Sequence, residues 1–153
     1  MRSVFRISSL LVISILVLLT LSSAINDDAE MLLAFKSAMS DPDGALAGWT
    51  ESDAANFCGW TGVLCNEFNR TSSLDLTNMN LSGIIPPRTL SSLDSLVNLS
   101  LALNKFSTPF PSAILDISTL RFLNISNNNF SGEIPANISR LVNLELLDTY
   151  NNN

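Results

Sequence analysis

The chain has 153 residues, a net charge of −6 at pH 7 and no histidine. Without histidine it lacks the side chain on which most acid–base catalysis, nucleophilic triads and zinc sites depend. Its acidic balance also lacks the basic footprint that nucleic acids require, so we expect no enzyme, no metal site, no cofactor and no nucleic-acid partner.

The first segment has the features of a secretory signal peptide. Arg2 and Arg6 give it a basic start, and residues 7–21 (ISSLLVISILVLLTL) are almost wholly apolar. This run of 15 residues is shorter than the about 20 that a membrane-spanning helix needs. Small residues follow up to Ala24. We therefore expect a signal peptide over 1–24 and a product in the secretory pathway, outside the cell.

Residues 25–68 are expected to form an N-terminal cap. Its start, DDAEMLLAFKSAM, combines acids with apolar residues at helical spacing, which predicts an amphipathic helix over about 28–39. Asp41-Pro42 ends this pattern, because the residue before a proline is pushed out of the helical region. The segment up to Glu67 is strongly acidic, whereas the rest of the chain is nearly neutral.

Two cysteines, Cys58 and Cys65, lie in the stretch NFCGWTGVLCN. An even pair in a secreted chain predicts a disulfide. The chain-entropy model gives about 2–3 kcal/mol for so short a loop. A redox pair is usually spaced C-x-x-C, so six intervening residues favour a structural bridge. We expect Trp49 and Trp60 to pack nearby as an apolar lid.

The remainder, residues 69–153, repeats itself. A fixed period in the twenties with the pattern L-x-L-x-x-N-x-L is the leucine-rich repeat signature. The predicted fold class is therefore an α/β solenoid, a right-handed leucine-rich repeat superhelix with a helical, disulfide-stapled N-terminal cap. The repeats start 25, 24 and 24 residues apart, at LDLTNMNLSGIIP (74–86), LSLALNKFSTPFP (99–111), LNISNNNFSGEIP (123–135) and LDTYNNN (147–153).

Asparagines recur at one phase of the repeat, at Asn104, Asn128 and Asn152. Their amides can bond to the backbone of neighbouring turns, so we expect an internal asparagine ladder. The fourth unit lacks the phenylalanine, turn and proline of the third. Since natural arrays finish with a polar capping repeat, we interpret residue 153 as a break rather than a domain boundary, leaving three full repeats and a truncated fourth.

Alternation along a short strand turns the residues between the leucines toward the concave face. Most of them are small and polar, but an apolar-aromatic cluster grows toward the last repeat. The candidate contact surface comprises Phe122, Asn124, Leu146, Asp148 and Tyr150. It could form the edge of a peptide groove, or its members could be ordinary exposed residues.

Six N-x-S/T sequons fit a secreted glycoprotein. Two of them, at Asn98 and Asn124, should face the concave side, where glycans would block that face. The possible N-glycosylation sites are Asn69, Asn80, Asn98, Asn124, Asn129 and Asn137.

The motif L-x-L-x-x-N-x-L-S-G-x-I-P at 123–135 resembles the plant-specific class of leucine-rich repeat. The preceding helix and FCGWTGVLC resemble the N-terminal cap of plant leucine-rich-repeat receptor kinases, whose hallmark is C-x-W-x-G-V-x-C. LVNLELLDTYNNN is most similar to the fourth-repeat region of CLAVATA-class peptide receptors. Together these resemblances cover the chain from residue 25 onward.

The resemblance implies a plasma-membrane receptor with an extracellular horseshoe, a peptide or steroid ligand, a co-receptor and a cytoplasmic Ser/Thr kinase. The ligand groove of the CLAVATA class usually lies on middle repeats, so no ligand residue is carried over, and this part of the chain would cap and start the solenoid. Two alternatives stay open. One is a secreted, non-signalling interaction protein, such as a polygalacturonase-inhibitor-like or decoy form; the other is a truncated product without independent function.

Overall fold

The computed structural model describes residues 27–153, and the predicted signal peptide at 1–24 lies outside this range. Short strands alternate with 3-10 helices, labelled η, along most of this length. In chain order the elements are α2 (Asp27–Ser37), β1 (Met39–Ser40), η1 (Glu51–Gly59), β2 (Val63–Cys65), β3 (Thr71–Asp75), β4 (Ser82–Gly83), η2 (Leu90–Ser92), β5 (Asn98–Ser100), η3 (Ser112–Asp116), β6 (Phe122–Asn124), η4 (Ala136–Arg140) and β7 (Leu146–Asp148).

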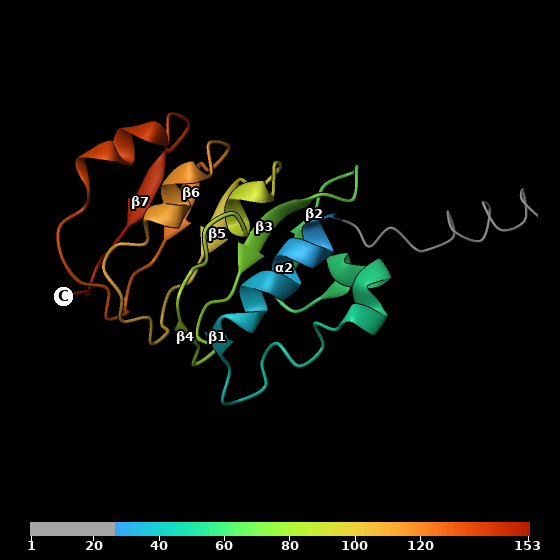
Figure 1. Ribbon diagram of the computed structural model, residues 1–153. Helices are drawn as coiled ribbons and strands as arrows, with labels where there is room; N and C mark the ends of the chain where they lie inside the picture. Colours follow the sequence, from blue (N-terminus) through green and yellow to red (C-terminus); the bar gives the residue numbers. More distant parts are fainter. Residues whose placement is uncertain (1–26) are drawn as a thin grey trace, which may run out of the picture.

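The main sheet has five strands in the order β2-β3-β5-β6-β7. β3, β5, β6 and β7 are parallel to one another, and β2 pairs antiparallel with β3. Figure 1 shows these strands side by side, with η2, η3 and η4 stacked in a separate row. The cap helix α2 lies at the β2–β3 end (Figure 1). The predicted leucine-rich repeat solenoid with an N-terminal cap is confirmed.

The core follows from the register of the parallel strands. Leu74 pairs with Leu99, and Leu99 pairs with Leu123, so the first leucine of each repeat stacks on that of the next. All three are buried, and burying a leucine side chain contributes about 1.5–3 kcal/mol. Behind them the rings of Phe106 and Phe130 stack with centroids 5.7 Å apart. Each repeat therefore buries its apolar face against its neighbours.

The cap helix is shorter than the sequence predicts. α2 ends at Ser37, and Met39, predicted on the helical face, lies instead in β1, which pairs antiparallel with β4. The two backbones approach closely because β4 contains Gly83: a Cβ at this position would lie 2.4 Å from the carbonyl oxygen of Ala38. Strand pairing between the cap and the first repeat therefore overrides the local helical pattern.

Two tryptophans of the cap belong to the buried core. The rings of Trp49 and Trp60 stack with centroids 5.5 Å apart, and both residues are buried. Each indole N–H has an acceptor, the carbonyl of Thr61 for Trp49 and the carboxylate of Asp53 for Trp60.

Within residues 27–153 no helix is long and apolar enough to cross a membrane.

Candidate protein-interaction surface

The outward face of the main sheet presents two rows of aligned side chains. Because successive residues of a strand point to opposite faces, the residues flanking each inward leucine point outward. Register places the members of a row directly beside one another. The first row is Leu64, Ser73, Asn98, Phe122 and Leu146, and the second is Asp75, Ser100, Asn124 and Asp148.

Apolar side chains gather on this face at β6 and β7. Phe122 is 38% exposed and pairs in register with Leu146, which is 50% exposed. Tyr150, two residues beyond β7, is 76% exposed. A shallow hollow of about 180 Å³ crosses the strands here, lined among others by Ser73, Asp75, Asn98, Phe122, Asn124 and Leu146.

The second row serves the local backbone as well as the surface. Asp75, Asn124 and Asp148 each accept, at 3.0 Å, the backbone N–H of the residue two positions later. These are Asx turns, in which a side-chain oxygen replaces a backbone acceptor. Asn124 and Asp148, predicted as contact residues, therefore also shape the ends of their strands.

The asparagines at the ladder phase connect each repeat to the one before it. The side-chain amide of Asn128 donates to the carbonyl of Leu101 at 2.8 Å, and its oxygen accepts the N–H of Phe106 at 3.1 Å. Asn104 and Asn152 make the corresponding bonds one repeat earlier and one repeat later. Buried backbone groups that the short strands leave unpaired are satisfied in this way.

Each NNN run, at 127–129 and 151–153, has three separate roles. The first asparagine takes a left-handed conformation, with φ of 53° at Asn127 and 54° at Asn151. The second is the ladder residue. The first and third asparagines of the second run donate to the side-chain oxygens of the same positions in the first run. Asn151 donates to Asn127 at 3.0 Å, and Asn153 donates to Asn129 at 2.7 Å. Only the role of the middle asparagine was predicted from the sequence. The whole triplet recurs at one phase of the repeat, and this recurrence could have predicted a role for the outer two as well.

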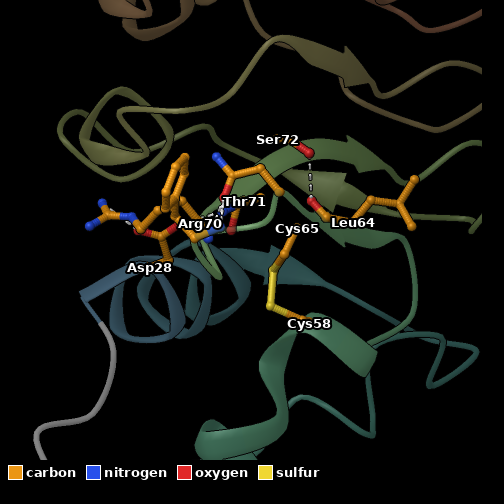
Figure 2. Close-up of a disulfide and its surroundings, with 9 residues drawn as sticks. Asp28, Cys58, Leu64, Cys65, Arg70, Thr71 and Ser72 are labelled. Atoms are coloured by element: carbon orange, nitrogen blue, oxygen red, sulfur yellow. Dashed lines mark hydrogen bonds and ion pairs between the residues drawn. A yellow bond between two sulfur atoms is a disulfide. The ribbon is translucent and has the colours of Figure 1, made fainter.

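An ion pair between a buried aspartate and a half-buried arginine joins the cap helix to the first repeat, and it was not predicted from the sequence. Asp28 is fully buried; one of its oxygens accepts the N–H of Thr71 at 2.6 Å, and the other pairs with Arg70 at 2.7 Å. Arg70 also contacts Asp94 at 3.1 Å. Figure 2 shows Asp28 on the helix facing the start of β3. The available signal was that Asp28 shares a helical face with Leu32.

The predicted disulfide between Cys58 and Cys65 is confirmed, with the two Cα atoms 5.5 Å apart. It joins η1 to β2 (Figure 2). Gly62 precedes β2 with φ of +80°, and a Cβ there would lie 2.3 Å from the carbonyl oxygen of Asp75. The bridge therefore fixes β2 to η1, and the glycine allows the chain before β2 to lie close to β3.

Comparison with known families and structures agrees with this geometry. The family described as Leucine rich repeat N-terminal domain matches residues 25–66, and the family described as Leucine Rich Repeat matches residues 119–141. The crystal structure of the BIR2 ectodomain from Arabidopsis thaliana superposes with a TM-score of 0.76 at 32% identity, covering 82% of this chain and 67% of that one.

This chain belongs to the leucine-rich repeat proteins. Its repeat region is of the plant receptor-kinase ectodomain type. The receptor-like kinase SKM1 of Arabidopsis thaliana is 40% identical over 93 residues, which is 61% of this chain and 10% of SKM1. The HAESA receptor kinase of the same species superposes with a TM-score of 0.78 at 32% identity, covering 84% of this chain and 22% of that one. The chain thus spans about a tenth of the length of the curated relatives it matches.

The leucine-rich repeat scaffold places the sequon asparagines in different surroundings. Asn98 and Asn124 lie on the outward face, in β5 and β6. The amide of Asn80 donates to Asp43 at 2.9 Å. Exposed sequon residues are Asn69, Asn98, Asn129 and Asn137, and half-buried ones are Asn80 and Asn124.

Within residues 27–153, no group of three or more histidine, cysteine, aspartate or glutamate side chains could hold a metal ion.

Proposed function

We propose that this chain is an extracellular protein-recognition module of a plant receptor, in which residues 25–68 cap and start the solenoid. The observation that carries the proposal is the exposed apolar group Phe122, Leu146 and Tyr150 on an outward face whose positions in β3 and β5 are small or polar. Exposed aromatic and apolar anchors surrounded by polar residues are typical of interaction surfaces.

The relatives support a peptide ligand and a co-receptor as partners. The HAESA structure is described as a complex with the peptide hormone IDA and the co-receptor SERK1. A second matched structure is described as PEPR1–AtPEP1. We infer that this chain contributes to the same kind of assembly. The more specific assignment to the CLAVATA class of peptide receptors stays a prediction from the sequence pattern of residues 141–153.

The receptor setting is also a proposal. The curated relatives are leucine-rich repeat receptor-like serine/threonine-protein kinases much longer than this chain, so a kinase domain and a plasma-membrane location belong to the proposed parent receptor. Residues 27–153 would supply recognition and a stable start to the solenoid. A secreted, non-signalling interaction protein would use the same outward face, and the two differ in whether binding changes the activity of a linked kinase.

The test uses the full chain secreted from plant or insect cells. Binding is measured by biolayer interferometry against synthetic plant peptide hormones, including IDA and AtPEP1, and against the SERK1 ectodomain. The Leu146→Ser/Tyr150→Ala variant removes two exposed anchors from the face. The control is Val142→Ser, which alters a side chain that is 77% exposed and precedes β7.

We expect at least one peptide or the SERK1 ectodomain to bind the wild-type chain. The affinity of that partner should fall at least about tenfold in the double variant, because losing interface anchors typically removes more than about 1.4 kcal/mol of binding free energy. The same partner should bind the Val142→Ser variant unchanged. Equal loss in both variants, or no binding to any peptide or to SERK1, contradicts the proposal.

A further inference from the structure

The outward face contains a sequon directly beside an exposed aromatic ring. Asn98 is the first residue of β5 and pairs in register with Phe122 on β6 and Ser73 on β3. It begins the sequon Asn98-Leu99-Ser100 and is exposed. Its side chain makes no hydrogen bond within residues 27–153, so its amide nitrogen is open to solvent.

The ring of Phe122 is partly exposed on the outward face. It is 38% exposed, although the guanidinium of Arg121 lies over it, 5.6 Å from the ring centroid. Neighbouring strands lie about 4.8 Å apart, which places the ring within reach of a group attached to Asn98. On the opposite flank, Ser73 is small and leaves room.

We propose that Asn98 carries an N-linked glycan whose first sugar packs on Phe122. The amide nitrogen of Asn98 attacks C1 of the first N-acetylglucosamine of a lipid-pyrophosphate-linked oligosaccharide. A C–N bond forms, the C–O bond to the pyrophosphate breaks, the amide loses one proton, and the lipid pyrophosphate leaves. Nothing is oxidised or reduced. This step takes place in the secretory pathway and therefore rests on the extracellular placement in the proposed function.

The first sugar of the glycan and the ring of Phe122 have complementary surfaces. A pyranose presents C–H groups on one face, and an aromatic ring presents the negative side of its quadrupole. Contact between them removes apolar surface of Phe122 from water without leaving a polar group unpaired. The glycan would thus cover the part of the Phe122 ring that the protein leaves exposed.

The second sequon on this face lacks such a partner. Asn124 is half-buried, and its oxygen accepts both the N–H of Ser126 at 3.0 Å and the hydroxyl of Ser126 at 2.7 Å. In register it stands between Ser100 and Asp148, neither of which is aromatic. The pairing of sugar with ring therefore belongs to Asn98.

A glycan at Asn98 would also divide the outward face. It would cover the hollow over β3, β5 and β6, because Asn98 and Phe122 both line it. Protein contact would then be confined to Leu146 and Tyr150 at β7. The modification thereby sets which part of the proposed recognition surface is open to partners.

The experiment secretes the full chain from plant cells and maps glycan occupancy by glycopeptide mass spectrometry. Tm is then compared for Asn98→Gln, in the wild type and in the Phe122→Ala background. Asn137→Gln is the matched control, because it removes a sequon on the exposed 3-10 helix η4. The same variants made in bacteria, without glycans, separate the effect of the sugar from that of the amide side chain.

We expect Asn98 to be occupied and Asn98→Gln to lower Tm by about 2–4 °C in the secreted protein. This loss should vanish in the Phe122→Ala background and in the bacterial protein, and Asn137→Gln should leave Tm unchanged. An empty Asn98 beside other occupied sequons overturns the proposal, as does a Tm loss that is the same with and without Phe122. If none of the six sequons is occupied, the extracellular placement fails as well.

Discussion

The cap and the repeats are stabilised in different ways. Residues 27–68 depend on single, unrepeated contacts: one disulfide, one pair of stacked tryptophans and one buried carboxylate that pairs with Arg70. The repeats use the same few contacts several times, with leucines stacked in register and one asparagine ladder residue in each of the second, third and fourth repeats.

This difference has a thermodynamic consequence. In a repeat array each unit contacts mainly its neighbours, so stability is approximately a sum of similar terms. In the cap each contact occurs once, and no second copy replaces it; the bond between Asp28 and the N–H of Thr71, for example, joins α2 to the first repeat. Loss of one cap contact should therefore separate the cap from the first repeat, while loss of one repeat contact should weaken two adjacent turns.

The largest effect is expected from Gly62→Ala, which tests the closest contact in the cap. The new Cβ would lie 2.3 Å from the carbonyl oxygen of Asp75, in a backbone conformation with φ of +80°. Clash and strain together should lower the free energy of unfolding by about 4 kcal/mol, as measured by urea denaturation. Gly59→Ala is the control, because nothing lies within 4 Å of its Cβ, and it should be nearly neutral. Similar losses in both variants would show that the close approach is not decisive.

Asn128→Ala tests the ladder in the repeats. It removes the acceptor of the Phe106 N–H and a donor to the Leu101 carbonyl. Two interior backbone groups lose their partner, which should lower the free energy of unfolding by about 3 kcal/mol. Asn143→Ala removes one exposed bond, to the carbonyl of Ser118, and should lower it by less than about 1 kcal/mol. If the two variants unfold at the same urea concentration, the ladder bonds contribute no more to stability than an exposed hydrogen bond does.

Replacing both cysteines by serine tests the covalent link within the cap. A bridge between Cys58 and Cys65 closes a short loop, so its removal should lower the free energy of unfolding by about 2.5 kcal/mol. Reducing agent should destabilise the wild-type protein by the same amount and leave the double serine variant unchanged. A wild type insensitive to reduction would mean that the tryptophan packing alone holds η1 to β2.

Leu103→Asn is the smallest expected effect and the only one that stabilises. Leu103 has φ of 56°, whereas Asn78, Asn127 and Asn151 hold this left-handed position in the other repeats. Asparagine tolerates this conformation better than leucine, so the free energy of unfolding should rise by about 1 kcal/mol. Leu103→Ala keeps the strain while removing the side chain, and it should show no such gain. A larger gain from alanine than from asparagine would assign the effect to the exposed leucine side chain instead.

Local and periodic features of this protein could be predicted from the sequence. The period of 24 to 25 residues predicted stacked parallel strands, and the phase of Asn104, Asn128 and Asn152 predicted where amides face the interior. The cysteine pair predicted its own bridge. Repetition makes such features predictable from the sequence. Each unit has the same type of residue at the same position, so the geometry of one turn determines that of the next.

Only the tertiary structure decided the contacts that join unlike segments. It ended α2 at Ser37, because β1 of the cap pairs with β4 of the first repeat. It buried Asp28 against Arg70. Such pairs lie 42 to 44 residues apart in the sequence and bear no shared motif. Their proximity is set by how the cap closes on the first repeat and by which strand stacks on which, and no local propensity encodes either.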